Sequence, residues 1–194
     1  MTDYLFPYTK LSPPQLGSSL VERRRLQTAL LNAIPRHKLT LIAAPAGSGK
    51  TILASTLMDG DWLAAWLTLD ATDDDLPAFL TLLVGALGER LQNGGQAIMN
   101  FLQTVPGAHE KGAQIATILI NHLLPIENPP LVLILDDYHT LENKAVHEFV
   151  SYLLDYLPQE LRIVITARHD PLLPLARLRA RGELAEIRLS QLRF

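Results

Sequence analysis

Residues 44–51 of this chain read Ala44-Pro45-Ala46-Gly47-Ser48-Gly49-Lys50-Thr51. The stretch matches Walker A, the phosphate-binding pattern G-x-x-x-x-G-K-[ST], at every fixed position except the first, where Ala44 stands. That position falls at the end of a predicted strand, so we expect an alanine to be tolerated there. The apolar run 39–43 precedes the motif and a helical pattern follows it, which is the strand-loop-helix setting that the motif requires.

Each position of this loop has a physical task. Gly47 and Gly49 permit the tight turn that aims backbone N–H groups at phosphate oxygens, and the helix that begins there adds the positive end of its dipole. We expect Lys50 to reach the β- and γ-phosphates and Thr51 to bind Mg²⁺ through its hydroxyl. The predicted nucleotide-binding residues of this segment are Pro45, Ala46, Gly47, Ser48, Gly49, Lys50, Thr51 and Ile52. The alternative is a glycine-rich turn that carries a lysine by chance.

A second motif, Asp136-Asp137, follows the apolar run 131–135. Five consecutive apolar residues are typical of a strand buried on both faces of a parallel sheet, and two acids at its end form a Walker B pattern. We expect Asp136 to bind Mg²⁺, partly through water, and Asp137 to orient or deprotonate the attacking water. Adjacent acids after a strand also occur by chance, but the Walker A motif upstream favours the catalytic interpretation.

Two arginines are further candidates. Arg168 follows the predicted strand 161–167, which in a five-stranded ATPase sheet neighbours the strand of the phosphate-binding loop. A guanidinium at that strand end can sense the γ-phosphate, because it is planar, always charged and donates in pairs; a solvated arginine or an ion pair with Asp170 is the alternative. Near the amino terminus we expect Arg23 to lie near the nucleotide and Val21 to contact the base, against an equal alternative of a solvated helix face.

Strand and helix patterns alternate along the chain. This alternation predicts an α/β fold of three layers, α/β/α, with a mainly parallel five-stranded sheet. Right-handed crossovers would place the carboxyl ends of the strands at one edge, where ligands bind. Predicted strands are 39–43, 62–69, 131–135, 161–167 and 183–189; predicted helices are about 20–34, 49–58, 73–91, two pieces within 96–125, 143–156 and 175–181. We interpret residues 1–19 as an extended arm and 20–194 as one P-loop NTPase domain.

Composition narrows the classes of protein. The 194 residues are 48% hydrophobic and 19% charged, as in ordinary globular domains, and no run reaches the roughly 18 apolar residues that cross a bilayer. The chain has no cysteine, which excludes disulfides, thiolate zinc sites and a thiol nucleophile and fits a reducing cytoplasm. A net charge of −3 offers no electrostatic footprint for nucleic acid. None of the six histidines pairs with acids at metal-ligand spacing.

Taken together, several segments resemble a known family. The chain is similar to the start of MalT-like regulators, the large LuxR-type transcriptional activators within the STAND class of P-loop NTPases. The similarity is weakest over 71–128, and it departs at Ala167, where relatives often have serine. The segments that carry it are Thr9-Lys10-Leu11, Leu20-Val21-x-Arg23, residues 44–51, Trp66-Leu67-Thr68-Leu69-Asp70, Leu135-Asp136-Asp137-Tyr138-His139, Thr166-Ala167-Arg168, residues 174–182 and Leu192-Arg193-Phe194.

This resemblance implies an ATP-driven switch. It implies ATP or ADP and Mg²⁺ as cofactors, slow hydrolysis, and a change from a resting ADP-bound monomer to self-association when inducer and ATP are present. In the family, a winged-helix segment, sensor repeats and a helix-turn-helix follow the NTPase domain. We therefore expect an excised domain in the cytoplasm that contacts nucleotide and either itself or its own further domains, and that binds neither DNA nor membrane.

Two other functions stay open from the sequence. A P-loop small-molecule kinase needs an acceptor pocket and usually an arginine-rich lid, which Arg177, Arg179 and Arg181 could imitate. The tandem acids Asp136 and Asp137 favour ATPase chemistry over this kinase. A nucleotide-binding interaction module without turnover would use the same phosphate-binding loop.

Overall fold

A computed structural model of the chain describes residues 6–14, 23–91, 94–123 and 130–192. Its sheet has the strand order β2-β3-β4-β1-β5, and every neighbouring pair is parallel. The strands are β1 Leu39–Ala43, β2 Leu63–Thr68, β3 Leu131–Asp136, β4 Leu161–Ala167 and β5 Leu184–Arg188. The predicted parallel sheet is therefore confirmed.

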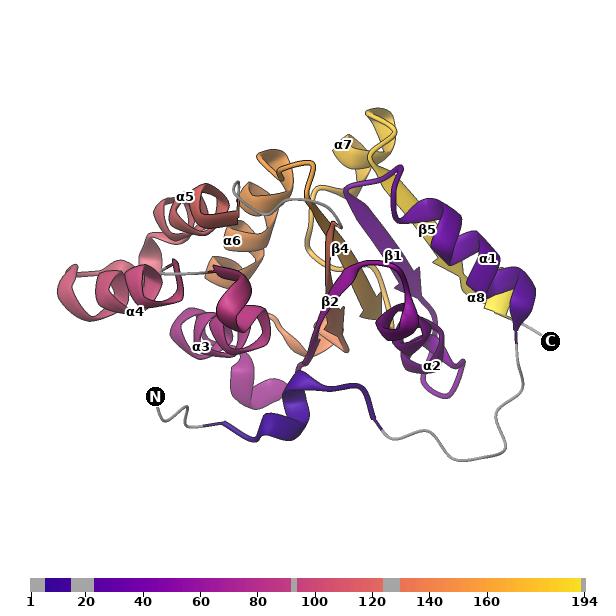
Figure 1. The fold of residues 1–194 in the computed structure, drawn as a ribbon, viewed down its shortest axis with the longest axis horizontal. Helices are drawn as coiled ribbons and strands as arrows, with labels where there is room; N and C mark the ends of the chain where they lie inside the picture. Colours follow the sequence, from indigo (N-terminus) through magenta and orange to yellow (C-terminus); the bar gives the residue numbers. More distant parts are fainter. Residues whose placement is uncertain (1–5, 15–22, 92–93, 124–129, 193–194) are drawn as a thin grey trace.

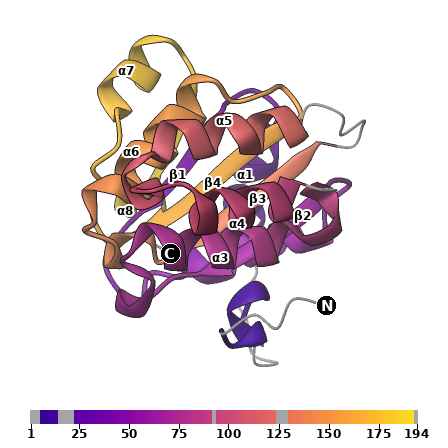
Figure 2. The same ribbon diagram turned by 90° about the vertical axis from the view of Figure 1, so that its left-hand side faces the viewer.

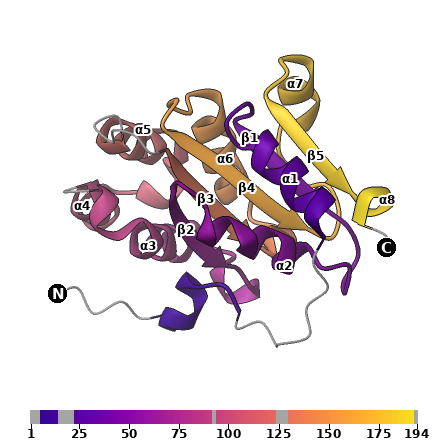
Figure 3. The same ribbon diagram turned by 45° about the vertical axis from the view of Figure 1, so that its right-hand side comes forward.

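Helices cover both faces of the sheet, as the three-layer prediction requires. Figure 2 shows α3 to α6 on one face, and Figure 3 shows α1 and α2 in front of the other. The α-helices are α1 Arg24–Ala33, α2 Lys50–Ser55, α3 Leu76–Leu87, α4 Gly94–Thr104, α5 Gly112–Leu123, α6 Lys144–Asp155, α7 Leu175–Ala180 and α8 Leu189–Leu192. In the described ranges, no helix has the length and apolar character needed to cross a membrane.

Two hydrophobic cores follow from the alternation of side chains along each strand. On β1, Leu39 and Leu41 belong to the core under α3 to α6, and Ile42 belongs to the core under α1 and α2. On α1, Leu26 and Leu30 are buried in that second core together with Ile34, which follows the helix. β1 is thus packed from both sides, and the loop that follows it starts from a fixed point.

Local hydrogen bonding explains where helix boundaries differ from the prediction. The helix expected from residue 73 begins at Leu76, because Asp70 and Asp73 form a capping box around a separate 3₁₀ turn, Ala71–Asp73. Asp75 then caps α3 by accepting a hydrogen bond from the backbone N of Ala78 at 3.3 Å. The α-helix after the phosphate-binding loop ends at Ser55 and continues only as a 3₁₀ turn. The last helix, α8, was not predicted.

The described part of the amino-terminal segment, residues 6–14, is not fully extended. Tyr8–Leu11 forms a 3₁₀ turn that contacts β2 and α3, and it is the dark turn below these elements in Figure 1. Lys10 Nζ lies 2.7 Å from carboxylate oxygens of both Asp70 and Asp73. The ion pairs attach the segment to the end of β2, whereas the proposed domain boundary at residue 20 stays a prediction.

We expect Lys10→Met to destabilise the fold by about 1–3 kcal/mol, because it leaves the buried Asp73 carboxylate without its charged donor. The matched control is Lys144→Met, which removes an exposed pair with Glu148 and should change the free energy of unfolding by under about 0.5 kcal/mol. Urea denaturation at neutral pH measures both. Equal effects of the two variants would contradict the anchoring role.

The ion pair between Lys10 and Asp70 predicts a pH dependence of the stability. Lys10 lowers the pKa of Asp70 to about 2 from the ordinary 3.8. A depressed folded-state pKa means that the stabilisation is complete above about pH 4 and is lost as the pH falls toward 2. The difference in unfolding free energy between the wild type and Lys10→Met should therefore shrink across that window.

Candidate nucleotide-binding site

The loop between β1 and α2 has the backbone conformation that its glycines predict. Gly47 and Gly49 adopt φ values of +75° and +85°, a region that favours glycine. The backbone N of Ala44 donates to the carbonyl oxygen of Ala167 at 3.1 Å, so the loop starts from the sheet. Ala44 is buried in the core under α1 and α2, where a small apolar residue fits the non-glycine first position of the motif.

Lys50 is buried, with 6% of its surface exposed, although it is charged. Its Nζ donates to the carbonyl oxygen of Pro45 at 3.2 Å, so the side chain folds back over the loop. Burial lowers the pKa of Lys50, while the charges of Asp137 and Asp136 raise it. The loop thus holds a cation close to the two acids.

Asp136 connects the loop to the sheet. Thr51 Oγ1 donates to Asp136 Oδ1 at 3.0 Å, and Thr166 Oγ1 donates to the same oxygen at 2.6 Å. Asp136 is only 2% exposed, and burial raises the pKa of its carboxyl while the Thr166 hydrogen bond lowers it. Thr51 and Asp136 are therefore in direct contact, as the Mg²⁺-binding prediction requires, although their role stays a prediction.

Asp137 turns away from the strand. Its φ of 57° is the only positive φ of a non-glycine residue in the described ranges, and its carboxylate is more exposed, at 39%. Its Oδ1 lies 3.7 Å from Nδ1 of His139. Burial lowers the pKa of His139, so this imidazole favours the neutral form. One acid is thus buried against Thr51 and the other is directed toward solvent.

Arg168 is exposed at the end of β4, which lies between β1 and β3. After burial, the positive charge of Arg168 also lowers the pKa of both Lys50 and His139. Asp170, the alternative ion-pair partner considered for Arg168, pairs with Arg188. This position suits the predicted contact with a γ-phosphate.

Arg23 contacts the loop from the other side. Its Nη1 donates to the carbonyl oxygens of Ser48 at 3.1 Å and Leu192 at 2.7 Å. The solvated helix face that was the alternative is therefore wrong for this residue. Val21 lies outside the described residues, and Ile52 is 38% exposed on α2.

The arginines of α7 lie away from this site. Arg177 pairs with Asp155 at 2.6 Å and Arg179 with Glu186 at 2.9 Å. α7 ends just before β5 begins, at the edge opposite the strand ends that carry the loop, and Figure 1 shows α7 and α2 at opposite ends of the sheet. These arginines do not form a lid over the loop, which weakens the kinase alternative.

Sequence reasoning missed the role of Thr166, the residue that joins the two acids. A polar side chain near the end of an otherwise apolar strand was the available signal. In the structure, Thr166 is fully buried and hydrogen-bonds to both Asp136 and the backbone of Asp137. Buried polar groups with two partners restrict geometry, so Thr166 belongs to the site.

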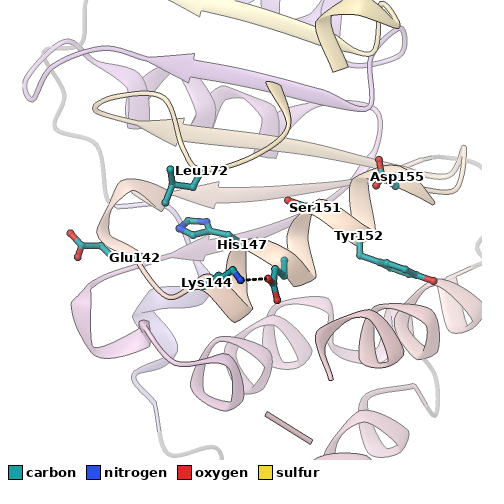
Figure 4. A pocket seen from close by; sticks show the side chains of 8 residues that line it. Glu142, Lys144, His147, Ser151, Tyr152, Asp155 and Leu172 are labelled. Carbon is teal, nitrogen blue, oxygen red and sulfur yellow. Dashed lines mark ion pairs between the residues drawn. The ribbon is translucent and has the colours of Figure 1, made fainter. Parts of the chain in front are cut away.

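A separate hollow of about 670 Å³ lies along α6 (Figure 4). It is lined by Glu142, Lys144, His147, Glu148, Ser151, Tyr152, Asp155 and Leu172. None of these residues belongs to the loop or to the tandem acids. Its size does not make it the candidate site, because the convergent charged groups lie elsewhere.

The loop, the tandem acids and the parallel sheet define the class: this is a P-loop NTPase fold. A Walker-type ATPase of Pyrococcus abyssi matches it with a TM-score of 0.52 and 11% identity, over 92% of this chain and 56% of that chain. A chain of Drosophila ORC bound to DNA matches with a TM-score of 0.50 and 11% identity, over 86% and 88%. At these identities the likeness concerns the fold alone.

Within this class, the chain is similar to the HTH-type transcriptional regulator MalT. It is 33% identical over 188 residues to MalT of Yersinia pestis (strain Pestoides F) and 32% identical over 188 residues to MalT of Yersinia enterocolitica. The match covers 96% of this chain, and the chain spans about a fifth of the length of these curated relatives. No protein-family model matches it. The predicted resemblance is confirmed.

We expect Gly47→Ala to cost about 1–2 kcal/mol of stability, because a Cβ at φ +75° is strained although nothing lies within 4 Å of it. Gly182→Ala is the matched control, since Gly182 has φ +68° and equally open surroundings after α7. Both variants should lose stability in urea denaturation, and only Gly47→Ala should also weaken nucleotide binding in calorimetry. Equal nucleotide affinities for the two variants would contradict a role for the loop backbone.

Proposed function

We propose that this chain binds and slowly hydrolyses ATP as the switch domain of a MalT-like transcriptional regulator. The observation that carries the proposal is the hydrogen bond of 3.0 Å between Thr51 of the loop and Asp136 at the end of β3. It brings together two groups that are 85 positions apart in the chain, beside the buried cation of Lys50. A polyphosphate with its metal needs these three groups at one place.

The donor set fits Mg²⁺. Thr51 offers a hydroxyl and Asp136 a carboxylate, which are the hard oxygen ligands that Mg²⁺ takes together with water and substrate phosphates. Thr51 and Asp136 would hold the ion, partly through water. Bound Mg²⁺ would neutralise charge on the β- and γ-phosphates.

The other residues of the site take roles by position. Lys50 would exchange its bond to the Pro45 carbonyl for β- and γ-phosphate oxygens. Asp137, the more exposed acid, would orient or deprotonate the attacking water, which adds to the γ-phosphorus as ADP leaves. Arg168 would stabilise charge on the γ-phosphoryl oxygens. The products are ADP and inorganic phosphate.

The remaining parts of the proposal rest on homology. Adenine over guanine follows from the resemblance to MalT-like regulators. To this we add the contact of Val21 with the base and the position of Arg23 beside the nucleotide, where Arg23 already bonds the Ser48 carbonyl of the loop. The same resemblance supports a domain over 20–194 that works in the cytoplasm through self-association or through other domains of a longer regulator. We propose that this domain itself contacts neither DNA nor a membrane.

We expect Lys50→Ala to weaken ATP and ADP binding by at least about tenfold to a hundredfold, because it removes the charge that faces the phosphates. Lys38→Ala is the control: Lys38 precedes β1 at the opposite edge of the sheet and pairs with Glu183. Titration calorimetry in Mg²⁺ compares the two variants with the wild type. Unchanged affinity in Lys50→Ala would count decisively against the site.

We expect Asp137→Asn to lower the hydrolysis rate by about a hundredfold or more while ATP still binds, because the amide cannot accept the proton of the attacking water. Asp61→Asn, an exposed acid before β2, should retain the wild-type rate. Phosphate release under single-turnover conditions measures the effect. If the wild type binds ATP without releasing phosphate, the chain is a nucleotide-dependent interaction module instead.

A further inference from the structure

One buried hydroxyl contacts both acids of the candidate site. Thr166 lies on β4, is 0% exposed, and donates from Oγ1 to Asp136 Oδ1 at 2.6 Å. Thr166 Oγ1 also accepts a hydrogen bond from the backbone N of Asp137 at 2.9 Å. Because the β3–β4 pairing ends with Leu135 opposite Ile165, Thr166 stands beside Asp136 at the next position of the register. The Thr166 hydroxyl therefore connects β4 to the end of β3 beyond the last backbone pair of the two strands.

The hydrogen atoms of this arrangement can be counted. A threonine hydroxyl has one hydrogen to donate and lone pairs to accept with. Its hydrogen is used by Asp136, and a lone pair is used by the N–H of Asp137. Asp136 Oδ1 then accepts two hydrogen bonds, from the hydroxyls of Thr51 and Thr166, while Oδ2 accepts no hydrogen bond from the described residues. One carboxylate oxygen is thus fixed by the protein, and the other is left for a metal or its water.

The backbone of Asp137 adds a second constraint. A non-glycine residue with positive φ is strained and persists only where its surroundings hold it. The hydrogen bond from its N–H to Thr166 Oγ1 is such a restraint, and Asp137 is the first residue after β3. The direction of the Asp137 side chain therefore depends on the Thr166 hydroxyl.

We propose that Thr166 is a positioning residue of this site. Its hydroxyl fixes the metal-binding carboxylate of Asp136 and the water-directing carboxylate of Asp137 relative to each other. The inference rests on the proposed function, because it assigns Asp136 to the metal and Asp137 to the attacking water. Thr166 touches neither nucleotide nor metal in this role. It acts through Asp136 and through the backbone of Asp137.

A merely structural threonine would fill volume in the sheet, and the protein contains a matched example. Thr40 on β1 is 1% exposed, and its Oγ1 has no hydrogen-bond partner among the described residues. Thr40 pairs with Val164, two positions before Thr166 on the same neighbouring strand. Thr40→Val and Thr166→Val therefore make the same chemical change at similar burial, and only the second removes hydrogen bonds.

The experiment compares wild type, Thr166→Val, Thr166→Ser and Thr40→Val. Calorimetry measures ADP affinity with Mg²⁺ and with EDTA, and single-turnover phosphate release measures hydrolysis. We expect Thr166→Val to keep its ADP affinity in EDTA within about threefold of the wild type. The factor by which Mg²⁺ increases ADP affinity should be about tenfold smaller than in the wild type, and ATP hydrolysis should be about a hundredfold slower. Thr166→Ser should restore both within about threefold, and Thr40→Val should match the wild type.

Other outcomes would overturn the proposal. If Thr166→Val keeps both the Mg²⁺ gain and the hydrolysis rate, the hydroxyl has no positioning role. If it loses Mg²⁺-free affinity to the same extent, or if Thr166→Ser is no better than Thr166→Val, the residue is only structural. Should Thr166→Val not fold, Thr166→Ala removes the same hydroxyl. A wild type without any Mg²⁺-dependent nucleotide binding would refute the proposed function, whereas a normal wild type with an unaffected Thr166→Val refutes this inference alone.

Discussion

The arrangement of the site depends on β4 lying between β1 and β3. The phosphate-binding loop leaves β1 and the tandem acids leave β3, so the two are separated by one full strand. Thr51 from α2 and Thr166 from β4 reach Asp136 from two sides and meet on a single carboxylate oxygen. A shift of β4 by one residue would turn the side chain of Thr166 to the other face of the sheet and would break this meeting point.

Burial then decides how charge is distributed over the site. Lys50 and Asp136 are both almost fully buried, and burial disfavours the charged form of each. The two acids raise the pKa of Lys50, and hydrogen bonds from Thr166 and Thr51 lower the pKa of Asp136. Burial has the largest influence on both pKa values, and the neighbouring charges and hydrogen bonds oppose it. Such a site is costly to disturb by changing one member.

Local patterns were sufficient for the fold, because the informative residues are adjacent in the chain. The run 131–135 predicts a strand buried on both faces, and β3 forms there. Residues 39–51 predict a strand, a loop and the start of a helix, and β1 and α2 form there. The turn that holds Lys10 was missed, since its partners Asp70 and Asp73 lie about 60 positions away. Thr166 was missed for the same reason, because its partners are on another strand. Pairing across strands is not encoded in the spacing of one segment.

The carbonyl groups of the loop explain why its other residues matter. A loop that directs N–H groups toward a ligand must find donors for the carbonyl oxygens that point elsewhere. The oxygen of Pro45 accepts from Ser48 Oγ at 2.8 Å and from Lys50 Nζ at 3.2 Å, and the oxygen of Ser48 accepts from Arg23 at 3.1 Å. When Lys50 moves to phosphate, Ser48 Oγ still satisfies Pro45, so the loop can keep its shape as its lysine changes partner. Arg23 meanwhile bonds the carbonyl of Leu192, which connects the backbone of the loop to α8.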